Sequence, residues 1–191
     1  MSHYFLESKL FYLTTILCIL QFSPTMAQQK NNTENTISEM VKKMTVEEKV
    51  GQMAQVSLEA LGKIEGSIFV FDNQKLKDAV NHFKIGSILN SPGIPLNVQQ
   101  WNAIIQQIEN EAKETRMKIP LLYCLDDNHG SNYILGATLF PQEIGQAATW
   151  NRKLIYDAAV ITAYESRAAG VPWTFSPVLD LGTNPQWPRI W

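Results

Sequence analysis

The stretch Pro120–Gly130 reads PLLYCLDDNHG, and it joins a short apolar run to an abruptly polar end. The apolar part, Pro120–Leu125, has the length and composition of a strand that is buried on both faces of a parallel sheet. Asp126, Asp127 and His129 follow directly. In α/β folds, the loops at the carboxyl ends of parallel strands carry the chemistry. The stretch therefore predicts an α/β protein with functional residues directly after this strand.

Helices and strands alternate on both sides of this stretch. Capping residues mark the expected helix starts, because Thr, Asp and Asn side chains accept hydrogen bonds from free backbone N–H groups. The expected elements are a short helix after Thr45, a strand over Gln52–Ser57, a helix after Asp72, a strand over Ile85–Asn90, an amphipathic helix after Asn97, the strand Pro120–Leu125, a helix from Asn151 to a stop at Gly170, and a strand over Val171–Leu179. This alternation indicates βαβ units and a parallel sheet.

Two α/β architectures have this alternation, a doubly wound open sheet and a (β/α)₈ barrel. An open sheet commonly carries a glycine-rich phosphate turn after its first strand, and the sequence between Gly51 and Gly66 offers none. A complete barrel takes about 250 residues, whereas 164 residues follow residue 27. We therefore expect an α/β fold that is an incomplete (β/α)₈ TIM-type barrel, roughly its first half.

The amino terminus has the pattern of an export signal. Lys9 precedes the apolar run Leu10–Leu20, and Thr25–Ala27 has the small residues that a signal peptidase prefers. The run is shorter than the roughly 20 apolar residues that span a bilayer; a buried core helix is the alternative. We expect residues 1–27 to be a signal peptide, 28–43 a polar leader and first helix, and 44–191 the barrel domain. The protein would be exported, periplasmic or secreted, with no membrane contact after cleavage.

Charge and cysteine content argue against a nucleic-acid-binding protein and against a protein stabilised by an intrachain disulfide. The chain has 16 Lys and Arg against 18 Asp and Glu, a net charge of −2, and no basic cluster, so no nucleic-acid partner is expected. Cleavage after Ala27 would leave Cys124 as the single cysteine, so no intrachain disulfide would form. Cys124 follows an apolar run, which predicts a buried, inert thiol.

The residues after the strands are the candidates for chemistry. Asp126 and Asp127 are adjacent, so in an extended chain their side chains face opposite ways and form a poor acid/base pair. The better partner of Asp126 is Asp180, at the end of the neighbouring strand, although an aspartate that caps a loop fits the same spacing. His129 is a base, a metal ligand or a loop histidine. Since no histidine follows it, a two-metal site lacks ligands, and we expect no metal.

Charged residues nearer the carboxyl end have simpler interpretations. Arg189 stands beside Trp187 and Trp191, where it forms either a cation–π contact or a fork that binds hydroxyls or a carboxylate. Charged residues on the expected helix surfaces are by default solvated; these are Glu143, Glu165 and Arg167.

Four sequence blocks resemble one known family. They are Phe140–Asn151 (FPQEIGQAATWN), Ala163–Gly170 (AYESRAAG), Phe175–Asp180 (FSPVLD) and Trp187–Arg189 (WPR). In this order they resemble the amino-terminal barrel of glycoside hydrolase family 3, especially its β-glucosidase and exo-glucanase branch. The resemblance covers about residues 44–191.

The resemblance implies retaining hydrolysis of terminal β-linked glucose or a related sugar, with an oligosaccharide or β-glucoside as substrate and no cofactor. That mechanism needs two carboxyl groups about 5–5.5 Å apart. In the family both come from later segments, so the nucleophile and the acid/base would lie beyond Trp191. The matching positions make Asp126 and Arg189 the substrate-binding residues, with His129 and Asp180 supporting them.

The sequence departs from the family's pattern at two places. Asp127 and Asn128 stand where a small and an apolar residue are usual, and Thr183-Asn184 replaces a more basic pair. We expect a hydrolase of the β-glucosidase type whose 191-residue chain is itself inactive. The alternative is an inert sugar-binding or scaffold fragment whose partner is the missing carboxyl-terminal half of the barrel. Such a half would leave sheet edges unpaired and an apolar face uncovered.

Overall fold

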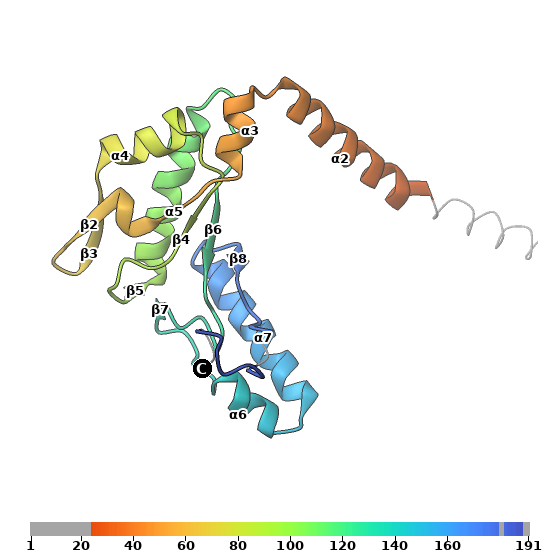
Figure 1. The fold of residues 1–191 in the computed structure, drawn as a ribbon, viewed down its shortest axis with the longest axis vertical. Helices are drawn as coiled ribbons and strands as arrows, with labels where there is room; N and C mark the ends of the chain where they lie inside the picture. The colour runs from red at the N-terminus through yellow and green to blue at the C-terminus, as the bar shows by residue number, and fades with distance from the viewer. Residues whose placement is uncertain (1–23, 180–181, 189–191) are drawn as a thin grey trace, which may run out of the picture. The chain divides into compact units, whose positions relative to one another are not determined.

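The computed structural model describes residues 24–179 and 182–188, with side chains from residue 33 onward, in two compact units divided after Thr45. The first unit contains helix α2, Pro24–Lys43 (Figure 1). Most of the expected signal peptide lies outside the described residues, and the expected cleavage point after Ala27 falls within α2. Cleavage therefore stays a prediction. Within the described part of the chain, no helix combines the length and apolarity that crossing a membrane requires.

The second unit is built on a four-stranded parallel sheet. Its strands are β1 (Gln55–Ser57), β4 (Ser87–Leu89), β6 (Leu122–Leu125) and β8 (Trp173–Thr174), in the order β1-β4-β6-β8. The spatial order follows the chain order, as in a barrel, whereas a doubly wound sheet reverses direction partway. The described strands form an open sheet with β1 and β8 at its edges; β4, β6 and β8 are labelled in Figure 1. The expected α/β fold with parallel strands alternating with helices is confirmed.

Five helices of this unit are α3 (Val46–Gln52), α4 (Asn73–Lys77), α5 (Val98–Lys113), α6 (Glu143–Ala148) and α7 (Arg152–Ala168), and a π-helical turn, Asp78–His82, extends α4. The predicted caps at Asp72, Asn97 and Asn151 are confirmed. Asp72 and Asn151 each accept two backbone N–H groups, and Asn97 forms a reciprocal capping box with Gln100. Gly170 follows α7 with a φ of 84°, the left-handed conformation that ends helices.

The core lies between the sheet and helices α4 and α5. Val56, Ile88 and Tyr123 are in register across the sheet and belong to one apolar cluster with α5. Trp101 of α5 is fully buried; its ring packs edge-on against Tyr123 at 5.6 Å between centroids, and its Nε1 donates to the Tyr133 carbonyl. The amphipathic pattern after Asn97 thus gives the helix that covers this face.

The predicted first strand, Gln52–Ser57, was wrong in its first half. Helix α3 runs through Gln52, and only Gln55–Ser57 pairs with β4. The amide of Gln52 donates to the carbonyls of Lys84 and Ile85, which holds the end of α3 against the turn before β4. A Cβ on Gly86 would lie 2.1 Å from the Gln52 carbonyl oxygen, so this close approach requires glycine.

The predicted strand Val171–Leu179 was too long, because only Trp173–Thr174 pairs with β6. The Thr174 hydroxyl accepts the Ser176 N–H, which turns the chain away from the sheet. Small sheets without a predicted counterpart are the antiparallel hairpin β2 (Gly62–Glu65) with β3 (Ile68–Phe71) and the parallel pair β5 (Leu96–Asn97) with β7 (Ile134–Leu135).

Candidate active site

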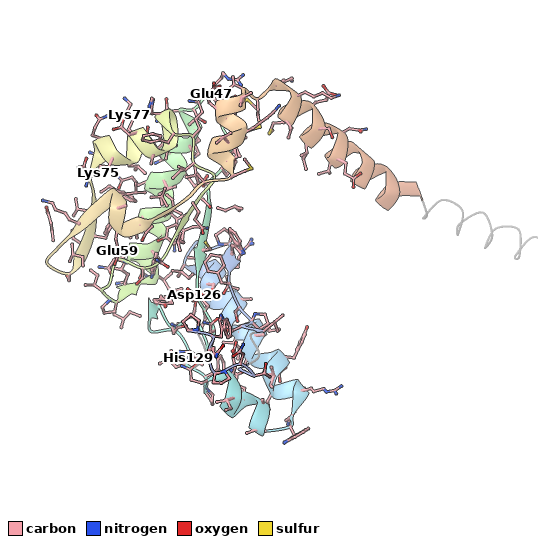
Figure 2. The ribbon with its side chains drawn as sticks, viewed as in Figure 1. Glu47, Glu59, Lys75, Lys77, Asp126 and His129 are labelled. Carbon is pink, nitrogen blue, oxygen red and sulfur yellow. The ribbon has the colours of Figure 1, made fainter. Side chains whose placement is uncertain are left out.

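The loop after β6 carries the main candidate, Asp126. Because strand side chains alternate, Asp126 shares its face of the sheet with Cys124 and Leu122, opposite the face that packs on α5. Asp126 is half-buried, and no described residue forms a hydrogen bond with its carboxylate. Figure 2 shows Asp126 and His129 on the part of the second unit that lies away from Lys75 and Lys77 of α4. The described residues therefore leave the carboxylate open to a ligand.

Cys124 forms the floor beneath Asp126 on this face. Its thiol is buried, accepts a hydrogen bond from the Gln55 amide at 3.2 Å and lies 3.5 Å from the Ile88 carbonyl. Burial, together with the nearby charge of Asp126, raises the pKa of Cys124 to about 11, although the Gln55 hydrogen bond opposes the shift. A thiol with this pKa is protonated at neutral pH and a poor nucleophile. The predicted buried thiol is confirmed.

The two adjacent aspartates occupy different environments, as their alternation predicts. Asp127 is only 1 % exposed, and its Oδ2 lies within hydrogen-bond distance, 2.6 Å, of the Ser166 hydroxyl of α7. Burial raises the pKa of the Asp127 carboxyl, against the opposing effect of the Ser166 and Ser131 hydroxyls. Asp127 therefore faces α7. Asp126 alone of the pair is positioned for a ligand on the inner face, which is the face of the sheet that carries Cys124 and lies opposite α5.

His129 bonds to the loop that precedes α6. Its Nδ1 lies 3.2 Å from the Phe140 carbonyl oxygen, and the Phe140 N–H donates to the His129 carbonyl at 2.8 Å. Because a carbonyl only accepts, this contact places a proton on Nδ1 and leaves Nε2 for other partners. Of the three interpretations of His129, the geometry matches the loop histidine; its supporting role toward a substrate stays a prediction.

Gly130 fixes the shape of this loop. Its φ is 100°, and a Cβ there would lie 2.1 Å from the Thr138 carbonyl oxygen, so both the backbone conformation and the close approach require glycine. Thr138 is in turn held by Glu165 of α7, whose carboxylate accepts its backbone N–H and its hydroxyl, each at 2.9 Å. The loop after β6 is thus tied to α7 by specific polar contacts.

The expectation that Glu143 and Glu165 are merely solvated was wrong. Glu165 holds Thr138, and Glu143 accepts the Val178 N–H at 3.0 Å. Both side chains stabilise loops on this side of the sheet. Sequence spacing did not indicate these roles, because each partner lies 27 or 35 residues away along the chain. The only available signal was their position inside the blocks that carry the family resemblance.

Two hollows flank the loop. One, of about 470 Å³, lies between the loop after β4 and residues 132–139, at the carboxyl ends of the strands. The other, of about 370 Å³, is lined by α6, α7, residues 174–178 and the loop from Asp127. Loops at the carboxyl ends of parallel strands form the active sites of barrel enzymes. Both hollows lie beside such loops, and Asp126 lines neither of them.

Two predicted site residues, Asp180 and Arg189, lie outside the described residues, so the pairing of Asp126 with Asp180 and the role of Arg189 stay predictions. Among the described side chains, no group of three or more His, Cys, Asp and Glu is arranged to hold a metal ion.

Comparison with known proteins identifies the class. Residues 45–190 match the glycosyl hydrolase family 3 N-terminal domain, so the chain belongs to glycoside hydrolase family 3. It is 34 % identical to a lysosomal beta glucosidase of Dictyostelium discoideum over 90 % of its length, and 29 % identical to a periplasmic beta-glucosidase/beta-xylosidase of Dickeya chrysanthemi over 80 %. It spans 23 % and 24 % of these two relatives, about a quarter of each.

Solved structures agree with this assignment. A beta-glucosidase from Listeria innocua, in complex with glucose, is 28 % identical with a TM-score of 0.58, over 82 % of this chain and 20 % of that one. A glycoside hydrolase family 3 beta-N-acetylglucosaminidase from Paenibacillus has a TM-score of 0.60 at 24 % identity, over 74 % of this chain and 26 % of that one. The second likeness shows the fold, which is the TIM-barrel-like α/β fold of this domain.

Proposed function

We propose that this chain is the sugar-holding amino-terminal part of a retaining β-glycosidase that removes terminal β-linked glucose. The observation that carries the proposal is the Asp126 carboxylate, which ends β6 on the inner face of the sheet and has no hydrogen bond to a described residue. A carboxylate in this state accepts hydrogen bonds from sugar hydroxyls without first losing a partner among the described residues. The beta-glucosidases among the relatives support glucose as the sugar.

The division of labour follows from the two candidate binding residues. Asp126 supplies acceptors for sugar hydroxyls, and Arg189 supplies donors in a planar fork. Retaining hydrolysis needs a nucleophile and an acid/base in addition, and we propose that both belong to segments beyond Trp191. The 191-residue chain by itself is then expected to bind a sugar without hydrolysing it.

Titration calorimetry with glucose tests the binding proposal. Replacing Asp126 by Ala should weaken glucose binding at least tenfold, because a charge-assisted hydrogen bond contributes about 1.5–3 kcal/mol. The matched control is Asp157→Asn, which changes an exposed aspartate that pairs with Lys153 on α7 and should leave binding unchanged. Unaltered binding by Asp126→Ala, or no glucose binding by the unmodified chain, would contradict the proposal.

An activity assay tests the proposed separation of binding from catalysis. We expect no release of nitrophenol from a nitrophenyl β-glucoside by the purified chain. Turnover that survives further purification and is lost in Asp126→Ala would show that the chain contains its own nucleophile. That result would refute the inactive state while leaving the glycosidase assignment intact.

The alternative is a scaffold fragment that pairs with the missing carboxyl-terminal half of the barrel. One specific observation favours such pairing, the exposed apolar surface of α7. Leu154, Tyr156, Val160, Ile161 and Tyr164 are all exposed. In a barrel, each helix packs between its neighbours, so we propose that the carboxyl-terminal half of the barrel covers this surface in the working enzyme. An apolar dye that fluoresces on exposed surface should bind the 191-residue chain strongly, and weak dye binding would contradict this proposal.

Export is also proposed. The relatives include a lysosomal and a periplasmic beta-glucosidase, and the first 27 residues have the pattern of a signal peptide. Mass spectrometry of the chain recovered from a secreting host should show a mature protein that begins at Gln28. A recovered chain that retains Met1–Ala27 would refute the cleavage.

A further inference from the structure

A buried polar cluster connects the loop after β6 to helix α7. It consists of Asp127, Ser131 and Ser166, whose exposed fractions are 1 %, 0 % and 5 %. The Ser166 hydroxyl lies 2.6 Å from Asp127 Oδ2, 2.7 Å from the Ser131 hydroxyl and 2.9 Å from the Thr162 carbonyl oxygen. Buried polar side chains of this kind form hydrogen bonds in nearly all proteins. The number of hydrogens that these contacts require therefore indicates which groups carry them.

Three short oxygen–oxygen contacts around Ser166 need three hydrogens. The Ser166 and Ser131 hydroxyls supply one each. An ionised Asp127 supplies none, so the Ser166 hydrogen would have to be shared between the Asp127 carboxylate and the Thr162 carbonyl. A neutral Asp127 supplies the third. Ser166 then accepts from Asp127 and from Ser131 and donates to the Thr162 carbonyl, which uses its one donor and both of its lone pairs.

The surroundings of Asp127 favour the same neutral state. Its second oxygen, Oδ1, is buried without a hydrogen-bond partner among the described residues, and an unpaired carboxylate oxygen is far more costly to bury than an acid carbonyl. The titratable groups around it are Asp126 and His129 on the same loop, Glu165 on α7, and Glu143 on α6, which lines the same hollow. His129 and the two glutamates bond to backbone groups elsewhere, and no described cation pairs with Asp127.

We propose that Asp127 is a positioning residue: as a neutral carboxylic acid it donates a hydrogen bond to Ser166 of α7 and thereby holds Asp126 in place. The backbone completes this arrangement. The Asp127 N–H donates to the Thr174 hydroxyl of β8 at 3.3 Å, and the Asn128 N–H donates to the Asp126 carbonyl at 3.0 Å. The loop is thus attached to both β8 and α7. The importance of Asp126 to a sugar rests on the proposed function, whereas the state of Asp127 does not.

The pH dependence of stability tests the neutral state without any ligand. A carboxyl whose folded-state pKa is raised binds its proton more tightly in the folded chain, so the folded state loses stability as pH rises from about 4, the ordinary pKa, to the raised value. Asp127→Asn keeps a donor toward Ser166 but does not titrate. Between those two pKa values, the unfolding constant of the unmodified chain should rise about tenfold per pH unit relative to that of Asp127→Asn.

Urea unfolding of both chains between pH 4 and pH 8 gives this comparison. Asp157→Asn on the exposed face of α7 is the matched control, and its profile should lack this steep divergence. An ionised Asp127 that accepts from Ser166 would give the opposite sign: the unmodified chain would gain stability over Asp127→Asn as pH rises. That result, or parallel profiles, would overturn the proposal.

Hydrogen exchange tests the positioning role. The Asn128 and Asn132 amides, which donate to the Asp126 and Gly130 carbonyls, should stay protected in Asp127→Asn and exchange at least tenfold faster in Asp127→Ala, while the α5 amides remain protected in both. Equal protection in the two variants would overturn the positioning role. If the chain binds glucose, Asp127→Asn should keep its affinity and Asp127→Ala should lose at least threefold. Absence of glucose binding in every variant, including the unmodified chain, would refute the proposed function and leave the exchange result to decide the role of Asp127.

Discussion

Helices α5 and α7 have similar lengths and similar starts but differ in how they pack. They contain 16 and 17 residues, and an asparagine caps each of them. Helix α5 buries large side chains, among them the fully buried Trp101, whereas the side chains that α7 buries are the small Ala158, Thr162 and Ser166. Its large residues are exposed, Tyr164 by 76 %.

The difference shows which properties of a helix are local. Capping and propensity start a helix wherever the sequence provides them. Packing requires neighbours. Helix α5 contacts α4 and the small strands β5 and β7, while α7 leads to β8 at the edge of the described sheet. Helix α7 is held instead by polar contacts to the loop after β6, through Ser166 and Glu165. The candidate site is therefore supported by apolar packing on one side and by hydrogen bonds on the other.

The largest expected effect separates the two helices directly. Trp101→Ala should lower the free energy of unfolding by about 3–5 kcal/mol, because it removes a fully buried ring and leaves a cavity. The matched substitution on α7, Tyr164→Ala, should change it by less than about 0.5 kcal/mol. Urea unfolding followed by circular dichroism measures both. Equal losses in the two variants would show that α7 is packed as firmly as α5.

The loop between the two helices provides a second matched pair. Gly130 and Gly136 both have positive φ values, but only at Gly130 would a Cβ meet nearby backbone, whereas the space around Gly136 is open. Gly136→Ala should lower stability by about 1 kcal/mol from backbone strain alone, and Gly130→Ala by about 1–3 kcal/mol more, because the Thr138 backbone must shift. Similar losses at the two positions would show that the close approach to Thr138 contributes nothing.

The polar attachment of α7 is tested at Ser166. Ser166→Ala removes the partner of a buried carboxyl and should lower the free energy of unfolding by about 1–3 kcal/mol. Ser67→Ala, at an exposed serine in the β2–β3 hairpin, is the control and should stay within about 0.5 kcal/mol. If Ser166→Ala has the same melting temperature as the unmodified chain, hydrogen bonds from Ser166 do not hold α7.

The smallest expected effect concerns the two caps. Asn97→Ala should lower global stability by about 1 kcal/mol, because α5 belongs to the packed core. Asn151→Ala removes the same kind of cap but should mainly increase exchange in the first turn of α7, with a smaller change in the unfolding midpoint. A larger global loss from Asn151→Ala would reverse the comparison.

Much of the framework was predictable because it depends on nearby residues. The caps at Asp72, Asn97 and Asn151, the stop at Gly170 and the strand before Asp126 all follow from local chemistry. That strand is shorter than the predicted Pro120–Leu125, however, and its first residue, Leu122, is exposed rather than buried. The hairpin of β2 and β3 was missed although its signal was present, since Gly66 stands between two runs that pair strand to strand. The strand ends were misplaced because they are decided by distant partners, as when Gln52 bonds to the turn before β4.

The candidate site was predictable only in part. Alternation correctly separated Asp126 from Asp127, because the side-chain period of a strand is fixed. The cluster around Asp127 was not foreseeable, since Ser131 and Ser166 lie 35 residues apart and look ordinary in a sequence. Glu143 and Glu165 were assigned to solvent for the same reason. Contacts between segments distant in the chain depend on the fold itself, which local spacing does not encode.

A crystal structure of the 191-residue chain soaked with glucose would show whether the Asp126 carboxylate holds the sugar. We predict a glucose whose hydroxyls lie within about 3 Å of the Asp126 carboxylate, on the inner face above Cys124, with the Asp180 carboxyl on the same side of the sheet. Glucose bound elsewhere, or an Asp180 carboxyl on the opposite side of the sheet from Asp126, would contradict this prediction.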